Sequence, residues 1–368
     1  MARFSDVLSI FNGKNQKHVE NPNGKYPIYG SGGIMGYADE YLCEGNTIII
    51  GRKGTINKPI YVETPFWNVD TAFGLQANED VLLPKYLYYF CEKFNFEALS
   101  TTVTIPSLTK ARLLDIEIPL PPMSDQHHIA AVLDKVSDVI RLRKQQLAKL
   151  DELINARFVE MFGDPEINSY GWQKVNISAV LCGKASNGFF AKRDDYHEDG
   201  NVSVLGVAYV VNRMYSQVNL LPRTNATKED ILKYSLHYGD MLFCRSSLVA
   251  AGIGKASIVP ENTPNNTLFE CHVIRLPLDL EKCVPEFMQV LSTTDYFRKQ
   301  IIAQSKTATM TTISQDGILK ADVILPPIEK QREFYAFILQ VNDTRAALQG
   351  ALEQAQLLFD SLMQKYFG

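Results

Sequence analysis

The sequence contains one segment twice, and this duplication constrains the fold more than any other feature. Residues 120–126 read LPPMSDQ, and 205 positions later residues 325–331 read LPPIEKQ. The correspondence continues without a gap to MFG at 161–163 and YFG at 366–368. A fixed offset of this kind is typical of a supersecondary unit that occurs twice. The alternative is two unrelated Pro-Pro turns before two ordinary helices.

Shorter matches extend the repeat toward the amino-terminal side of each copy. FSDVL at 4–8 matches ISAVL at 177–181, and LPKYL at 83–87 resembles VPEFM at 284–288. TTVTI at 101–105 echoes ATMTT at 308–312. The order predicted from these matches is a variable domain, a helix, a second variable domain and a second helix. The corresponding ranges are 1–120, 121–163, 164–325 and 326–368.

Both repeated helices carry an apolar seam with heptad spacing. Apolar residues recur every seven positions in two interleaved series, the pattern of a long helix that packs against another helix. The predicted seam comprises Leu133, Val136, Ile140, Leu147, Leu150, Ile154 and Met161 in the first copy and Phe334, Val341, Leu348, Leu352, Phe359 and Leu362 in the second. Arg143 and Arg345 interrupt it, and polar residues at seam positions can fix the register.

The favoured arrangement is an antiparallel coiled coil of the two helices, related by a pseudo-two-fold axis. Prolines 121–122 and 326–327 suit helix starts, and Gly163 and Gly368 suit helix ends. The alternative is that each amphipathic helix packs on its own domain. The predicted fold class is α+β, with two globular, strand-rich domains separated by two long helices.

The variable domains read as strand-rich units with comparable loops. Strands are expected at 47–51 and 58–62 in the first domain and at 241–244 and 256–259 in the second. Each pair encloses a loop with a basic residue near both ends, and a Gly-Asn or Gly-Asp turn precedes each pair. Short helices are expected at 84–96 and 285–300.

Composition excludes several classes of protein. Apolar residues make up 46% of the chain and charged residues 21%, as in ordinary globular domains. No apolar run approaches the roughly 18–20 residues of a membrane span, and the first residues lack a signal-peptide pattern. Six cysteines without a C-x-x-C spacing suit a reducing cytoplasm and disfavour a structural zinc site. We therefore expect a cytoplasmic protein without membrane contact.

No catalytic constellation emerges from the sequence, so we expect no catalytic residues and no metal site. The six histidines lack H-E-x-x-H or comparable spacing. The glycine cluster at 30–33 is not G-x-G-x-x-G and has no strand–helix frame, which disfavours a dinucleotide or S-adenosylmethionine loop. A turn or a flexible recognition loop fits it better. Neither LPPM nor LPPI has the polar residue that an amino-methyltransferase places before Pro-Pro.

The organisation as a whole resembles the specificity subunits of type I restriction–modification systems. A variable domain leads through Pro-Pro-x-x-x-Gln into a long heptad helix that ends in MFGDP at 161–165, and the order then repeats. FGDP at 162–165, followed by Asn168 and Gly171-Trp172, resembles the junction into the second target-recognition domain of that family. The first domain has no counterpart of Gly171-Trp172.

The resemblance implies a non-catalytic subunit that reads DNA. Each variable domain would read one half of a bipartite, gapped target in double-stranded DNA, and the helix pair would set the spacer. Two methyltransferase (modification) subunits would dock on it and methylate adenine with S-adenosylmethionine bound in those subunits. A restriction subunit that translocates and cleaves DNA would join them. No cofactor is expected on this chain.

The net charge sets a limit on how such a chain binds DNA. The whole chain carries −4, and residues 1–120 contain 11 basic and 13 acidic residues. Phosphate neutralisation by basic residues supplies much of DNA affinity, whereas base contacts supply specificity. We therefore expect the other subunits to provide most phosphate contacts and the isolated chain to bind DNA poorly.

Candidate base-reading residues are polar or basic side chains in the loops of the two domains, since such side chains pair with base edges. In the first domain they are Tyr29, Gly30, Ser31, Arg52, Lys53, Lys58, Thr101, Thr102 and Thr104, and in the second Lys192, Arg193, Arg245, Ser246, Lys255, Lys306 and Thr307. Arg52 with Arg245, and Lys58 with Lys255, occupy comparable loop positions. For any one of these residues, a solvated surface charge or strand-end cap is the alternative.

Three other functions stay open at the level of sequence. One is the specificity subunit of a related enzyme whose nuclease and methyltransferase are fused in a single partner. A second is a non-catalytic adaptor whose repeats bind only proteins. The third, a stand-alone nuclease or methyltransferase, is disfavoured because its motifs are missing from the sequence.

Overall fold

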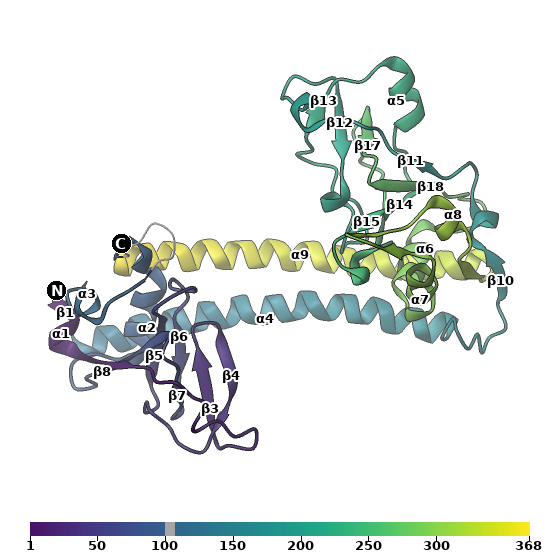
Figure 1. The fold of residues 1–368 in the computed structure, drawn as a ribbon. Coiled ribbons are helices and arrows are strands. Elements are labelled where there is room, and N and C mark those ends of the chain that lie inside the picture. Colours follow the sequence, from purple (N-terminus) through teal and green to yellow (C-terminus); the bar gives the residue numbers. More distant parts are fainter. Residues whose placement is uncertain (100–106) are drawn as a thin grey trace. The chain divides into compact units, whose positions relative to one another are not determined.

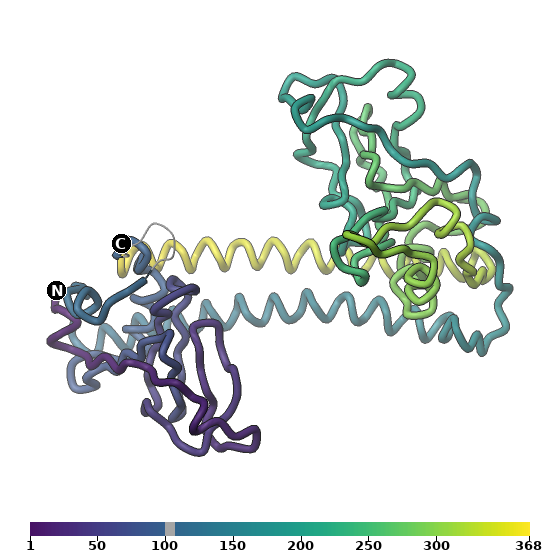
Figure 2. Tube along the Cα trace, in the orientation of Figure 1, coloured from purple at the N-terminus to yellow at the C-terminus, as the bar shows by residue number. Residues whose placement is uncertain are grey.

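The computed structural model describes residues 1–99 and 107–368, which form two compact units (Figures 1 and 2). Unit 1 comprises 1–146 and 348–368, and unit 2 comprises 147–347. The long helices α4 (Met123–Phe162) and α9 (Ile328–Phe367) each contribute one part to each unit. Both helices begin directly after a Pro-Pro pair, because proline is accepted in the first turn of a helix but not inside it.

In the described residues, unit 1 holds three antiparallel or mixed sheets and unit 2 holds four, in addition to their helices. The strands of unit 1 are β1 (Ala2–Arg3), β2 (Leu8–Asn12), β3 (Tyr26–Gly30), β4 (Gly33–Ala38), β5 (Thr47–Gly51), β6 (Ile60–Val62), β7 (Trp67–Asn68), β8 (Ala72–Ala77) and β9 (Glu117–Ile118). Its short helices are α1 (Phe4–Val7), α2 (Pro84–Lys93), η1 (Phe96–Leu99) and α3 (Lys110–Leu114). The predicted strand 47–51 is present, and the predicted strand at 58–62 is confined to β6.

Unit 2 is larger but follows the same sequence of elements. Its strands are β10 (Gln173–Asn176), β11 (Ser186–Asn187), β12 (Val202–Leu205), β13 (Arg223–Thr224), β14 (Asp240–Cys244), β15 (Ser246–Ser247), β16 (Ala256–Ile258), β17 (Thr267–Phe269), β18 (Val273–Pro277), β19 (Lys306–Thr307), β20 (Thr311–Thr312) and β21 (Asp322–Leu325). Its short helices are η2 (Ile177–Val180), η3 (Arg193–Asp195), η4 (Val207–Tyr209), α5 (Lys228–Tyr234), η5 (Ala250–Gly252), α6 (Pro285–Thr293), α7 (Asp295–Gln304) and α8 (Gln315–Leu319).

The strand order shows that the two units share one topology. Unit 1 has the sheets β1-β9, β2-β8-β5-β6 and β4-β3-β7, and unit 2 has β10-β21, β11-β18-β14-β16 and β13-β12-β17. In the last sheet of each unit the middle strand pairs with one neighbour antiparallel and with the other parallel. The sequence repeat therefore corresponds to a repeat of the fold. Unit 2 has an additional small sheet, β15-β20-β19.

The core of each unit is completed by parts of both long helices. In unit 1, Ile129 and Leu133 from the start of α4 share an apolar cluster with Met363 near the end of α9. In unit 2, Phe158 from the end of α4 shares a cluster with Phe334 near the start of α9. Within each unit the two helices therefore pack antiparallel. Every predicted seam residue is buried or half-buried.

The seam is wider than the heptad series predicts. Phe158 and Met363 are 1% and 4% exposed, and they occupy the same position in the two copies of the repeat. Neither belongs to the predicted seam. Because each helix packs on its own domain as well as on the other helix, its apolar stripe has to cover more than the narrow face of a coiled coil. Packing of the two helices on each other and packing of each helix on a domain therefore occur together.

The Pro-Pro-x-x-x-Gln motif is a buried anchor for the helix start. The Gln126 amide accepts a hydrogen bond from the backbone N–H of Leu83 at 2.9 Å and donates to the carbonyl oxygens of Val81 and Pro121, both at 2.9 Å. Gln331 accepts likewise from the N–H of Val284 at 2.9 Å and donates to Pro326 at 2.8 Å. Leu83 and Val284 are the N-cap residues of α2 and α6, so the glutamine joins two helix starts.

The predicted helix at 285–300 is instead two helices. α6 ends at Thr293 and α7 begins at Asp295, with extended backbone at Thr294 between them. The Thr294 hydroxyl accepts a hydrogen bond from the N–H of Phe297, which is the N-cap interaction that starts a new helix.

Within 1–99 and 107–368, no helix is both long enough and apolar enough to span a bilayer.

Candidate nucleic-acid interface

Arg52 and Arg245 occupy the same place in the two units. Each directly follows the equivalent strand, β5 or β14. The N–H of Arg52 donates to the Thr71 carbonyl at 2.8 Å, and that of Arg245 donates to the His272 carbonyl at 2.9 Å. The carbonyl of Arg52 accepts from the N–H of Leu108, and that of Arg245 from the N–H of Ile313, both at 3.0 Å. Backbone bonds on both sides hold each arginine in place.

The side chains of the two arginines rest on neighbouring groups without a carboxylate partner. The Arg52 guanidinium lies over the Phe73 ring, with 6.0 Å between Cζ and the ring centroid. Arg245 Nη1 donates to the Cys271 carbonyl at 3.0 Å. Among the ion pairs of the described residues, none includes either arginine. Their charges are therefore available to an external acceptor such as a base edge or a phosphate.

Lys58 and Lys255 are also equivalent by strand register. Ile48 and Met241 are equivalent, because each lies four residues before the equivalent arginine. Ile48 pairs with Tyr61 and Met241 pairs with Ile258, and each lysine lies three residues before that paired residue. The two basic positions thus bracket the same loop in both units. The loop differs in length, running from 52 to 58 in unit 1 and from 245 to 255 in unit 2. A shared frame with unlike loops is the arrangement expected of two readers of different sequences.

In unit 1 the structure gathers part of the predicted set around Gly51. A Cβ on Gly51 would lie 2.9 Å from the Cβ of Ser31, so the turn after β3 approaches the Arg52–Lys53 loop. Lys53 forms a backbone bridge with Ser107. The Tyr29 ring packs against Phe66 with centroids 5.5 Å apart, and burial raises the pKa of its hydroxyl. Gly30 is buried at the end of β3.

Three predicted residues of this domain lie outside the described part of the chain. These are Thr101, Thr102 and Thr104, which fall within residues 100–106. Their roles stay predictions.

In unit 2 the small sheet β15-β20-β19 brings four predicted residues together. Ser246 in β15 pairs with Thr312 in β20, and Lys306 in β19 pairs with the same Thr312. Thr307 lies beside Thr311, with hydroxyl oxygens 3.0 Å apart. Arg245 precedes Ser246 and is tied to Ile313 immediately after β20. The result is a sheet edge with hydroxyl and cationic side chains.

Sequence reasoning missed His272, which belongs to this cluster. Its Nδ1 lies 2.9 Å from the Ser246 hydroxyl, and its ring is exposed. The loop also carries Leu248 and Val249, which are 84% and 63% exposed. The signal that could have found His272 is its position directly before β18, the strand that pairs with β14. No periodicity marks Leu248 or Val249.

Lys192 and Arg193 belong to a different element from this cluster. They form the start of η3, whose Asp195 carbonyl accepts a hydrogen bond from the Thr224 hydroxyl at 2.9 Å. Within the described residues, no hydrogen bond or ion pair links them to Arg245 or Ser246. Lys255 likewise points elsewhere, since its ammonium donates to the Asn212 side chain.

The glycine-rich turn at 30–33 does not have the frame of a dinucleotide-binding loop. The 30–33 turn joins β3 to β4, which pair antiparallel, and not a strand to a helix as a nucleotide-binding loop requires. Over 1–99 and 107–368, no group of three or more histidine, cysteine, aspartate or glutamate residues could hold a metal ion. The chemistry of the interface is hydrogen bonding and charge.

Comparison with known proteins finds the same class of protein that the sequence repeat resembles, the type I specificity subunits. The family model "Type I restriction modification DNA specificity domain" matches residues 1–152. The chain is 22% identical to the type I restriction enzyme EcoKI specificity subunit of Escherichia coli K12 and 25% identical to the StySPI specificity subunit of Salmonella potsdam. Each match covers 86% of this chain and 72% of the relative.

A solved structure shares the whole fold. The crystal structure of the type I restriction–modification S subunit from M. genitalium superposes over 100% of this chain and 95% of its own, with a TM-score of 0.63 and 15% identity. The duplicated fold and the matched domain support a DNA-recognition subunit. In the domain matched at residues 1–152, in these relatives and in its fold, the chain is similar to type I restriction–modification specificity subunits.

Proposed function

We propose that this chain reads a bipartite, gapped DNA target, with one half of the target read by each unit. One observation carries the proposal: the two units share three sheets of the same strand order but hold unlike loops at 52–58 and 245–255. Each loop begins at an equivalent arginine, Arg52 or Arg245, and ends at an equivalent lysine, Lys58 or Lys255. The two arginines suit guanine, and the hydroxyls of Ser246 and Thr307 suit either donor or acceptor edges. Two readers with different side chains should select two different half-sites.

The long helices would set the spacer and dock the partner subunits. A 40-residue α-helix is about 60 Å long, which is enough to separate two readers by at least one turn of DNA. In each unit these helices expose large apolar side chains, which suit protein contact. They are Val139, Leu142, Leu357 and Leu358 in unit 1 and Leu153, Val159 and Leu339 in unit 2.

The chemistry would lie in the partners. Two modification subunits would bind S-adenosylmethionine and methylate adenine, and a restriction subunit would translocate and cleave DNA. This chain would supply base contacts, and the partners would supply most phosphate contacts, since the chain carries a net charge of −4.

The test is co-expression of the chain with its partner subunits, followed by mapping of methylated adenines across the host genome. The expected result is a gapped motif with two unlike halves that disappears when this chain is omitted. Methylation at a continuous motif, or an unchanged pattern without the chain, would contradict the proposal and favour a purely protein-binding adaptor.

A further inference from the structure

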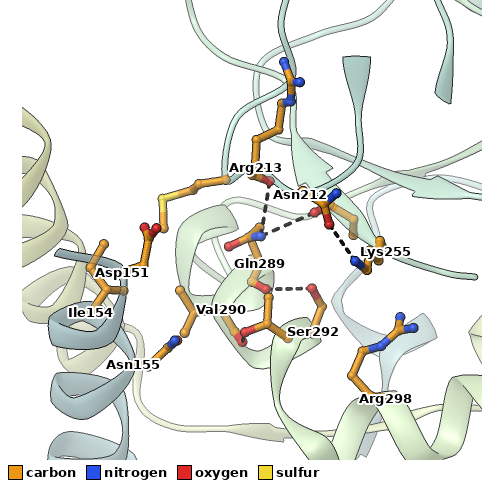
Figure 3. A pocket seen from close by; sticks show the side chains of 13 residues that line it. Asp151, Ile154, Asn155, Asn212, Arg213, Lys255, Gln289, Val290, Ser292 and Arg298 are labelled. Atoms are coloured by element: carbon orange, nitrogen blue, oxygen red, sulfur yellow. Dashed lines mark hydrogen bonds between the residues drawn. The ribbon is translucent and has the colours of Figure 1, made fainter. Parts of the chain in front are cut away.

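A pocket in unit 2 is lined by cations that lack an anionic partner. It has a volume of about 370 Å³ and lies between the end of α4, the segment 212–214, the start of β16 and the helices α6 and α7. Lys255, directly before β16, and Arg298 in α7 line it, and Figure 3 shows their charged ends on the same side of the pocket. Neither residue takes part in an ion pair within the described chain.

Arg298 is a partly buried cation without a counter-charge among the described residues. Its Nη2 donates to the Ala251 carbonyl at 3.2 Å, but its Nη1 is buried without a hydrogen-bond partner. Burial lowers the pKa of this guanidinium. A desolvated charge with an unmade hydrogen bond is costly unless an opposite charge approaches it. An anion in the pocket would offset the charge part of that cost.

Lys255 provides a second charge on the same wall. Its ammonium donates to the Asn212 side-chain oxygen, a neutral acceptor. The pocket's acidic residue, Asp151, is engaged elsewhere, because its carboxylate accepts from Arg345 Nη2 at 2.7 Å. The side of the pocket near Arg298 therefore keeps an excess of positive charge.

An oxyanion would be held by the two cations and not by the neighbouring amide. Gln289 is 6% exposed, and its Nε2 donates to the carbonyl oxygens of Ala256 at 3.3 Å and Arg213 at 3.4 Å, so its donors are already engaged within the protein. Arginine offers a planar set of donors and lysine a mobile point charge, a combination that suits the several oxygens of phosphate.

We propose that the Lys255–Arg298 pocket binds a phosphate group, carried by the DNA backbone or by a free phosphate compound. The proposal does not depend on which bases the unit reads. It assigns Lys255 to phosphate binding in place of base reading, because its ammonium faces this pocket and not the Arg245–Ser246 cluster.

The experiment is equilibrium binding of inorganic phosphate to the full chain by isothermal titration calorimetry, with chloride at matched ionic strength. Four proteins are compared: the natural chain, Lys255→Gln, Arg298→Gln and the exposed control Lys228→Gln. We expect a dissociation constant of about 1 mM or below for the natural chain and the control. Each pocket variant should weaken binding at least about tenfold, which corresponds to one lost charged contact.

A second arm separates the two sources of phosphate. A duplex of arbitrary sequence is added to the phosphate-loaded chain. Release of phosphate, with weaker duplex binding by Lys255→Gln, identifies the DNA backbone as the source. Retention of phosphate beside bound duplex identifies a free compound. Lys255 is only half-buried, so its variant should fold even if Arg298→Gln does not. Equal phosphate binding by the natural chain and Lys255→Gln, or no binding at about ten times the expected constant, would overturn the proposal.

Discussion

The ring of Phe367, next to the last residue, packs on Tyr86 in the first domain with centroids 5.0 Å apart. The counterpart in unit 2 is Phe162 at the end of α4, which packs on Phe287 with centroids 4.8 Å apart. Tyr86 and Phe287 occupy the same position in α2 and α6, and Phe162 and Phe367 are 205 residues apart. Each domain is therefore closed by the end of one long helix and the start of the other.

Replacing these phenylalanines should damage different units. Phe162 is fully buried, so Phe162→Ala should cost unit 2 about 3–5 kcal/mol, whereas half-buried Phe367→Ala should cost unit 1 about 1–3 kcal/mol. Hydrogen exchange followed by mass spectrometry checks this, with α6 and α2 as reporters. Faster exchange in α6 for the Phe367 variant, with α2 unaffected, would refute the pairing.

The buried glutamines should be necessary for stability although they touch no ligand. Gln126→Ala or Gln331→Ala leaves backbone donors and acceptors unpaired in a buried site. Each substitution should therefore lower the free energy of unfolding by about 1–3 kcal/mol. Thermal denaturation measures the loss. Gln145→Ala, an exposed change on α4, is the control and should leave the melting temperature nearly unchanged.

Glu286 should make stability fall as pH rises. It is 0% exposed, and burial raises the pKa of its carboxyl despite a hydrogen bond from the Tyr215 hydroxyl at 2.9 Å. The folded state holds the proton more tightly than the unfolded chain, so this contribution is lost as pH rises from about 4.3 through the folded pKa. Glu286→Gln should flatten that decline in a series of urea titrations, and exposed Glu281→Gln should not.

Changes at the two equivalent arginines should alter separate halves of the methylated motif. In the complex with its partners, Arg245→Gln should relax one half-site and Arg52→Gln the other, each by about 1–3 kcal/mol of discrimination at one base pair. Genome-wide methylation mapping is the readout. Loss of all methylation from both variants, with intact folding by circular dichroism, would argue that the arginines serve assembly and not reading.

The isolated chain should bind duplex DNA weakly. With a net charge of −4 it neutralises few phosphates, so affinity at physiological salt should stay near or above about 1 μM and depend weakly on salt. Fluorescence anisotropy at several salt concentrations measures both quantities. Nanomolar, sequence-specific binding without partners would contradict the division of contacts between subunits.

The repeat and the long helices could be predicted because both leave a periodic signal. The heptad series located buried or half-buried residues such as Leu133 and Phe334, and the Pro-Pro pairs marked both helix starts. The role of Gln126 and Gln331 was not accessible, because a buried amide that joins two helix starts depends on partners about 43 residues away. Phe158 and Met363 were missed because the stripe faces a domain as well as a helix.

The candidate interface was only partly predictable. The equivalence of Arg52 with Arg245 followed from comparable loops, and strand register places them identically. His272 was missed because its contact with Ser246 joins residues 26 positions apart across a strand pairing. Lys192 and Arg193 had a loop signal but belong to η3 and its N-cap, and no hydrogen bond or ion pair of the described residues joins them to Arg245 or Ser246. Composition alone cannot tell which loops a sheet brings together.

The closure of the first domain by Phe367 and its neighbours has a consequence for biosynthesis. Residues 1–99 leave the ribosome more than 200 residues before the segment 348–368 that completes their core. The earliest domain to be translated is thus the last to be finished, whereas unit 2 has its whole sequence once residue 347 has been added. A premature stop within residues 348–368 would therefore leave the core of unit 1, which contains the amino-terminal residues, incomplete.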